Sequence, residues 1–422
     1  MRATRTRFLS VGIAAATLAA LLAACSSGGS GGSANNSPSS KQPILIGASV
    51  SLTGDFSADG QAFQRGYNLW AADVNRAGGL LGRKVKMIYL DDKSDPTQGS
   101  TNVQELITSD HVNMLFGPFS SLITGPTASV AARYGFAMIE GAGGAPAVFS
   151  TASNLARHNV FDVSYPIVDG IDPVVSWIKS LPAAQRPKTA AYPIVNNPFT
   201  IPPVQKTQKA LEAIGVHTVY SKILPAELPN AKAIADQVAA AKADAVFLGS
   251  VDVPTVAAFM QAFQQQHYNP KLFFATSGPD QGAAFTKAVG VKNANGVLAS
   301  GSWFGGFDNA QSKVMVREYI AKYGGTASDI NADVAEAYGV GQVAALAIKA
   351  TRGTVQAKII SYLHSGVTFP TVQGPVKFDS LGMNTNPTVL VFQWQNGSFN
   401  QVLPVGAPGS GTITYPKPNW GS

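Results

Sequence analysis

Short apolar runs and longer amphipathic segments alternate along the chain from residue 43 onward. Apolar runs bounded by Gly, Pro or Asp predict buried strands, and segments with apolar residues three or four apart predict helices. Strands are predicted over 43–52, 84–92, 112–118 and 136–140, and helices over 61–79, 97–110 and about 124–135. Strands and helices in this order predict a parallel, doubly wound sheet with helices on both faces.

The same alternation starts again at Lys188. The second set has strands at 188–195, 218–224, 244–250 and 270–276, helices at 202–216, 231–243, 253–266, 311–324 and 333–351, and a hairpin at 388–405. Asn396–Gly397 is the expected hairpin turn. Two α/β lobes in sequence predict a ligand cleft at the loops that follow the carboxyl ends of the strands.

The first 42 residues carry a different pattern. Three arginines precede 15 apolar residues (8–22), and two alanines follow, so residues 1–24 read as a secretory signal peptide. The apolar stretch is shorter than the ~20 residues that a membrane-spanning helix needs. Residues 25–42, rich in Gly and Ser, are expected to be a flexible linker.

The stretch "LAAC", which ends at Cys25, resembles the lipobox of bacterial lipoproteins. The resemblance implies that Cys25 is lipidated and becomes the first residue of the mature chain. Two or more acyl chains give stable membrane attachment where one does not. The protein is then expected to be exported and anchored by lipid to the outer side of the bacterial cell membrane. The alternative is an ordinary secretory signal with an incidental cysteine.

Composition narrows the classes of function. The formal net charge is +7, which falls to +4 without the three signal arginines, and only 13% of residues are charged. No cluster of Lys and Arg appears, so no nucleic-acid partner is expected. Cys25 is the only cysteine and the five histidines are scattered, so neither a metal site, a cofactor nor a Cys/His nucleophile is expected.

Candidate ligand-binding residues follow the predicted strands. The hydroxyl of Ser120 or Ser121 could cap the next helix or, with the free N–H groups of its first turn, bind an anion. Ala142, Gly143 and Gly144 could turn backbone N–H groups toward a ligand. Other strand ends carry acidic and aromatic candidates, each of which could instead be a loop cap: Phe56, Phe199, Asp252, Asp280 and Trp303, with Asp55, Asp59 and Phe304 beside them.

Three segments resemble the leucine/isoleucine/valine-type periplasmic binding proteins, the substrate-binding components of ABC importers. They are "GASVSLTGDFSADGQAFQRGYNLWAADVNRAGGLLGRKVKMIYLDDKSDPTQG", "GPFSS" and "MIEGAGGAP". The resemblance implies an α/β type I periplasmic binding protein fold, with two Rossmann-like lobes joined by a three-strand hinge. The crossings are expected near 160–168, 290–300 and 366–375. The expected divisions are lobe 1 at 43–165 plus 296–370, lobe 2 at 166–295 plus 371–405, and a tail at 406–422.

The same resemblance assigns roles at the site. Ser121 and Ala142 to Gly144 are expected to hold a ligand carboxylate, although Gly144 replaces a common threonine. Phe199 matches a site aromatic, and Asp280 is the nearest candidate for holding an ammonium group. The expected ligand is a branched-chain amino acid or related small organic carboxylate, passed to permease subunits. The alternatives are a ligand-sensing receptor component, a binder of an amide, urea or aromatic acid, and a hydrolase-like enzyme that uses Ser120 or Ser121.

Overall fold

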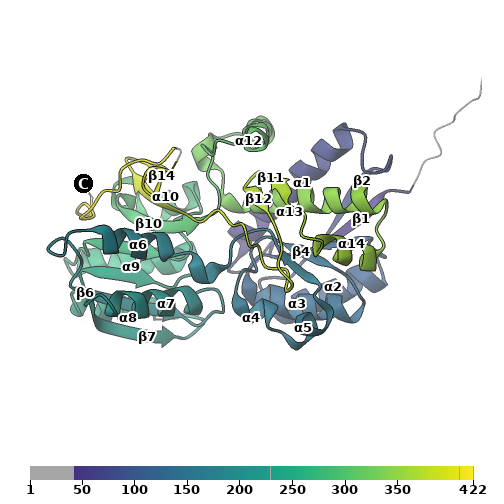
Figure 1. Ribbon diagram of the computed structural model, residues 1–422. Helices are drawn as coiled ribbons and strands as arrows, with labels where there is room; N and C mark the ends of the chain where they lie inside the picture. The colour runs from purple at the N-terminus through teal and green to yellow at the C-terminus, as the bar shows by residue number, and fades with distance from the viewer. Residues whose placement is uncertain (1–41, 229, 408, 422) are drawn as a thin grey trace, which may run out of the picture. The chain divides into compact units, whose positions relative to one another are not determined.

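Two large sheets form the framework of the computed structural model, which describes residues 42–228, 230–407 and 409–421 (Figure 1). The first sheet has the order β2-β1-β3-β4-β5, and its strands all run parallel. Its strands are β1 (Ile44–Val50), β2 (Val85–Asp91), β3 (Met114–Phe116), β4 (Met138–Glu140) and β5 (Val160–Asp162). The parallel, doubly wound sheet predicted for the first lobe is confirmed.

Both faces of the first sheet are covered by helices because successive side chains of a strand point to opposite faces. Ile46 and Ile139 pack in one cluster with the helices α1 and α13, and Leu115 and Met138 pack in another with α2 and α3. The helices of this lobe are α1 (Ser57–Arg76), α2 (Pro96–Thr108), α3 (Ser121–Arg133), α4 (Pro146–Phe149), α5 (Ala152–Arg157), α12 (Ala310–Tyr323), α13 (Ala332–Thr351) and α14 (Gln356–Leu363). A ribbon of β11 (Phe369–Thr371) and β12 (Gly374–Val376) packs beside α13.

The second sheet has the order β14-β13-β10-β9-β8-β6-β7. Its strands are β6 (Thr189–Val195), β7 (His217–Leu224), β8 (Ala245–Leu248), β9 (Leu272–Ala275), β10 (Val297–Gly301), β13 (Leu390–Gln395) and β14 (Ser398–Leu403). The first five are parallel, and β13 and β14 form the predicted antiparallel hairpin with Asn396 and Gly397 at its turn. Both turn residues have positive φ, which suits the Asn-Gly pair.

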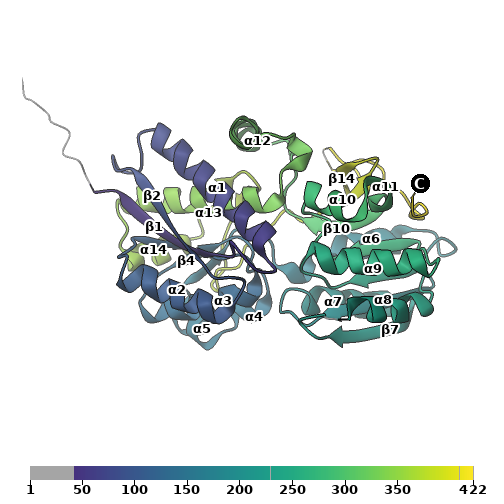
Figure 2. The same ribbon diagram turned by 180° about the vertical axis from the view of Figure 1, so that it is seen from behind.

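Alternate residues of these strands again face opposite layers. Val246 and Phe273 pack with α8 (Ala231–Ala240) and α9 (Val253–Gln265), which lie side by side in Figure 2. Phe247 and Phe274 pack with α6 (Asp172–Ser180) and α7 (Ile201–Glu212) on the other face. The short helices α10 (Ala283–Val289) and α11 (Val291–Ala294) precede β10.

Two predicted lobe boundaries are wrong. The prediction placed residues 296–370 in lobe 1, but β10 pairs with β9 and β13 of the second sheet, so that crossing begins after Gly301. Residues 371–405 were assigned to lobe 2, but Val376 and Phe378 pack in the core beside α1 and α13. The third crossing therefore lies between Phe378 and β13. Both errors arise because β10 and the β11–β12 ribbon were not predicted.

The segment predicted as a tail packs on the second lobe. The ring of Tyr415 lies edge-on to Trp177 at 5.2 Å between centroids. The Lys417 N–H donates to the Lys271 carbonyl at 2.7 Å, and Trp420 Nε1 donates to the Tyr268 carbonyl at 2.8 Å. These contacts cover apolar surface of the second lobe that the hairpin leaves accessible.

A close helix contact places α13 against α1. Gly341 of α13 lies beside Trp70 of α1, where an added Cβ would come within 2.2 Å of the indole Cδ2. Gly66 of α1 faces the Val334 carbonyl, and an added Cβ there would come within 2.3 Å of that oxygen. The missing side chains allow the two helices to approach. This contact holds the first two turns of α13, which carry Asp333 and Glu336.

Replacing Gly341 by Ala tests this contact. We expect the free energy of unfolding to fall by about 1–3 kcal/mol because the added methyl group collides with a buried indole. Gly125 of α3 is the matched control, since nothing lies within 4 Å of the position that an added Cβ would take there. Gly125→Ala should raise stability by up to about 1 kcal/mol. Denaturant unfolding measures both, and equal effects of the two substitutions would contradict the close contact.

Candidate ligand-binding site

A cavity lies where the carboxyl ends of parallel strands from both sheets meet. The cavity has a volume of about 60 Å³. That space corresponds to about four to six water molecules, so a small organic molecule fits. The lining residues come from the loops after β3, β4, β5, β6, β8 and β9, the end of β10 and the first turns of α13: Phe119, Ser120, Ala142, Gly144, Ser164, Tyr165, Ile167, Asn197, Phe199, Val251, Thr276, Ser277, Asp280, Ser300, Gly301, Ala332, Asp333 and Glu336.

Ser120 is a distinctive residue of the first wall. It directly precedes α3 and has φ +79° and ψ 139°, a backbone conformation that costs a non-glycine residue about 1–3 kcal/mol. Its side chain is buried, and its hydroxyl has no hydrogen-bond partner among the described residues. Next to it, the ring of Phe119 packs edge-on against Phe56 at 5.7 Å between centroids. The strained backbone thus holds an unpaired hydroxyl at the cavity.

The β4 loop differs from the anion cradle that the sequence suggested. The N–H groups of Ala142 and Gly143 both donate to the carboxylate of Glu140, and an added Cβ at Gly143 would lie 2.7 Å from that carboxyl group. Ser121 Oγ accepts the Ala145 N–H at 3.3 Å and contacts the Ala142 carbonyl at 3.5 Å. The N–H groups of Ala142, Gly143 and Ala145 are therefore bound within the protein. The expectation that Gly143 and Ser121 present free donors to a ligand is wrong.

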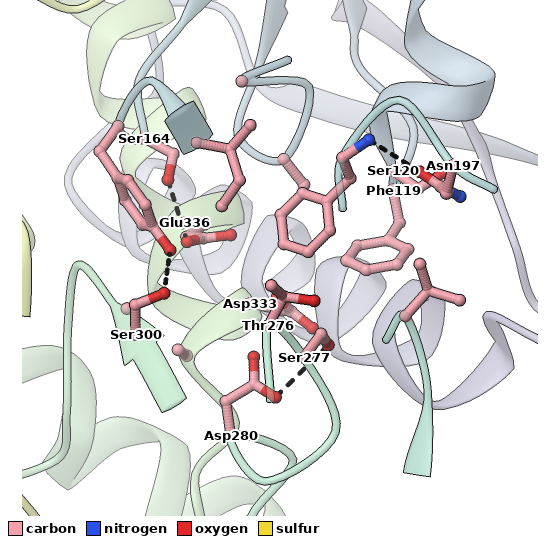
Figure 3. A pocket seen from close by; sticks show the side chains of 18 residues that line it. Phe119, Ser120, Ser164, Asn197, Thr276, Ser277, Asp280, Ser300, Asp333 and Glu336 are labelled. Carbon is pink, nitrogen blue, oxygen red and sulfur yellow. Dashed lines mark hydrogen bonds between the residues drawn. The ribbon is translucent and has the colours of Figure 1, made fainter. Parts of the chain in front are cut away.

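Three carboxyl groups, those of Asp280, Asp333 and Glu336, line the cavity, as Figure 3 shows. Glu336 Oε1 accepts hydrogen bonds from Ser164 at 3.2 Å and from Ser302 at 3.3 Å. The Asp280 carboxylate accepts the Gly278 N–H at 2.7 Å and lies 3.4 Å from Ser277 Oγ. No Lys, Arg or His is among the lining residues.

Further carboxyl groups lie directly behind this lining. Asp59 of α1 is buried beside Asp333, and its Oδ2 accepts from Gln281 Nε2 at 2.8 Å. This hydrogen bond joins the first lobe to the loop after β9 of the second. Glu140 and Asp162, at the ends of β4 and β5, are also fully buried. Six carboxyl groups therefore share one buried region.

Burial sets the protonation of this cluster, because a carboxylate loses its hydration when it leaves water. Loss of hydration raises the pKa of Asp280 to about 6 and that of Asp59 to about 7. Burial first, and the neighbouring carboxyl groups second, raise the pKa of Glu336 to about 8. Burial likewise raises the pKa of Glu140 to about 8, although two backbone N–H groups oppose the change. The pKa values of Asp162 and Asp333 rise well above the usual range for the same cause.

The structure brings together half of the candidates named from the sequence. Ser120, Ala142, Gly144, Phe199 and Asp280 line the cavity.

Phe56 stands behind Phe119, and Asp252 caps α9 by accepting the Thr255 N–H at 2.6 Å. Trp303 is buried, donates from Nε1 to Ser312 Oγ at 2.8 Å, and lines a smaller adjoining cavity. That cavity shares Asp280, Ser300, Gly301 and Ala332 with the larger one. Asp95 caps α2 by accepting the Gln98 N–H at 2.6 Å.

Several lining residues were not predicted. Ser164 and Tyr165 follow β5, and Ser300 ends β10, two short strands that the apolar pattern did not reveal. Asp333 and Glu336 lie in the first turns of α13, where acidic residues usually only complement the helix dipole. The available signal was the pair of acidic residues on an otherwise apolar helix.

The ligand-free protein should lose stability as the pH rises from 5 to 8. Each of the four carboxyl groups with a pKa of about 6 to 8 has a higher pKa folded than unfolded, so the folded state binds more protons in this range. The free energy of unfolding then falls with increasing pH. Carboxyl groups whose pKa is lowered in the folded protein change the pH dependence of the free energy of unfolding only near pH 4 and below.

Thermal melts measure this effect, with an expected fall in Tm on the order of 5 °C. Glu140→Gln should make the fall shallower because one titrating group is removed. Asp236→Asn, on the exposed face of α8, is the control and should leave the slope unchanged. A Tm that rises from pH 5 to pH 8 would contradict this assignment.

Comparison with known proteins gives the family. The sequence profile described as "Periplasmic binding protein" matches residues 43–398. A Leu/Ile/Val-binding protein homolog of Brucella abortus is 34% identical over 96 residues, which are 23% of this chain and 26% of the relative. An amino acid binding protein of Pseudomonas aeruginosa is 24% identical over 258 residues, 60% of this chain and 66% of the relative. The chain spans about a quarter of the length of the first curated relatives it matches.

Solved structures share the fold. A leucine binding protein from Thermotoga maritima gives a TM-score of 0.74 at 18% identity, covering 85% of this chain and 97% of that one. A solute binding protein from R. palustris, in complex with benzoate, gives a TM-score of 0.71 at 18% identity. The match covers 85% of this chain and 95% of that one. No described helix is both long and apolar enough to cross a bilayer. The chain belongs to the periplasmic binding protein family, with the two-lobed type I fold expected from its sequence.

Proposed function

We propose that this protein is the substrate-binding component of an ABC importer, which captures a small organic molecule in the cavity and presents it to permease subunits. The observation that carries the proposal is the cavity itself, because strand ends of both lobes line it in a chain of the periplasmic binding protein family. Ligands of open α/β sheets bind at such strand ends. The family is one of binding proteins, and among the described residues no histidine lines the cavity to activate Ser120.

The proposed ligand is a small amino acid with an apolar side chain. Phe119, Ile167, Phe199 and Val251 supply apolar surface to the cavity. The Brucella relative is named for binding leucine, isoleucine and valine, and one structural neighbour for binding leucine. A cavity of 60 Å³ suits a molecule of that size better than a peptide.

Ligand capture is proposed to shift the population of lobe arrangements. Tyr165 from the first crossing lies 3.2 Å, oxygen to oxygen, from Ser300 of β10, and Asp59 bonds Gln281. A ligand that contacts both walls favours the arrangement in which they face each other, by the difference in its affinity for the two states. The three crossings would then act as the hinge.

Lipid attachment at Cys25 is part of the proposal. Cys25 and the signal segment lie outside the described residues, so the support is the lipobox-like sequence alone. A linker of 17 residues (26–42) would let the binding lobes reach a permease in the same membrane.

Thermal shift with a panel of apolar amino acids, aromatic acids, amides and urea tests the proposal. An amino acid such as leucine at 100 times its Kd should stabilise the protein by about 2.7 kcal/mol. Phe199→Ala should weaken binding roughly tenfold or more, since about 1.5–3 kcal/mol of apolar burial is lost. Asp236→Asn is the control and should bind normally. A panel in which no compound raises Tm at millimolar concentration would contradict the proposed function.

A further inference from the structure

The electrostatics of the cavity identify which part of a ligand it recognises. We infer that the site selects a protonated amine on an apolar body, and that a ligand carboxylate is not required for binding. This inference rests on the proposed function, because it concerns the ligand of the same cavity. It reverses the expectation that the site is built around an anion.

Among the described residues, no Lys or Arg forms an ion pair with the carboxyl groups of the cavity cluster. The ion pairs of the described residues are formed by Arg76, Lys206, Lys232, Lys271 and Lys313, and none involves a carboxyl group of the cavity cluster. The charged groups that act most strongly on Asp333 and Glu336 are other carboxyl groups. Buried carboxylates without a cationic partner are unfavourable. A cationic ligand group supplies that partner.

Three backbone N–H groups of the β4 loop are already bound within the protein. A carboxylate is usually held by several N–H or hydroxyl groups aimed at it. In the β4 loop the donors of Ala142 and Gly143 are already bound to Glu140, and that of Ala145 to Ser121. A ligand carboxylate would have to displace the Glu140 carboxyl group from these N–H groups.

A further polar group, the hydroxyl of Ser120, lies on the same cavity. The Ser120 side chain is 7% exposed, lines the cavity, and has an unpaired hydroxyl among the described residues. A hydroxyl group can accept from an ammonium group as well as donate. The neutral hydroxyl and the acidic residues Asp280, Asp333 and Glu336 thus offer acceptors to one donor-rich cation. Phe119 and Phe199 provide the apolar surface for its body.

Three ligands with one carbon skeleton separate the possibilities. Leucine carries both charged groups, 3-methylbutylamine lacks the carboxylate, and 4-methylpentanoate lacks the amine. Calorimetric titration of the full chain at pH 7 should show 3-methylbutylamine binding within about tenfold of leucine. The carboxylate analogue should bind at least a hundredfold more weakly than leucine.

Other binding patterns of these three ligands would contradict the inference, the proposed function or both. Binding of 4-methylpentanoate as tightly as leucine, or of leucine with neither analogue, overturns the inference and leaves the proposed binding function standing. Failure of all three ligands, together with failure of the broader panel in thermal shift, would overturn the proposed function as well. The two failures are therefore distinguishable.

Isosteric variants test whether the carboxyl groups of the cluster cause the preference for the amine. Asp280→Asn and Glu336→Gln should each weaken 3-methylbutylamine at least tenfold, while weak binding of 4-methylpentanoate stays equal or improves. Asp236→Asn should change neither. A melting curve of each variant checks that it folds, and Asp333→Asn replaces any variant that does not. Unchanged amine affinity in folded variants would overturn the inference.

Discussion

The constraint on which the site depends is the burial of several carboxyl groups that have no basic partner among the described residues. Asp280, Asp333 and Glu336 line the cavity, with Asp59, Glu140 and Asp162 directly behind them. Without a ligand, the least costly way to bury such groups is to keep several of them protonated, as the raised pKa values indicate. A cation placed among them changes that balance. Ligand binding and the protonation of the cluster are therefore thermodynamically coupled, so a change in one changes the other.

The fold assembles this cluster from segments that are distant in sequence. Parallel strands bring their carboxyl ends to one edge of each sheet, which places the β4, β5 and β9 loops near one another. The α1–α13 contact, close because Gly66 and Gly341 lack side chains, adds Asp59 and Asp333. The Asp59–Gln281 hydrogen bond then links the cluster to the second lobe. Packing far from the cavity thus determines where its charges lie.

The sequence predicted the alternation of strands and helices and the hairpin at Asn396–Gly397, because both depend on local apolar patterns and turn chemistry. It did not predict β5 or β10, which have three and five residues, and so two lobe boundaries were wrong. It named candidates at strand ends, five of which line the cavity, but it did not predict the carboxyl groups of Asp333 and Glu336 there. The glycines at 143 and 144 indicate exposed N–H groups, whereas only the folded loop shows the Glu140 carboxyl group accepting the N–H groups of Ala142 and Gly143. Such a contact has no sequence signature.

The number of protons exchanged on ligand binding tests the central claim most directly. Calorimetric titration of leucine at pH 7 in two buffers of different ionisation enthalpy, such as phosphate and Tris, gives this number from the difference in observed enthalpy. An ammonium group near the cluster favours the ionised carboxylates, so binding should release protons to the buffer. Equal enthalpies in both buffers, or proton uptake, would contradict the account.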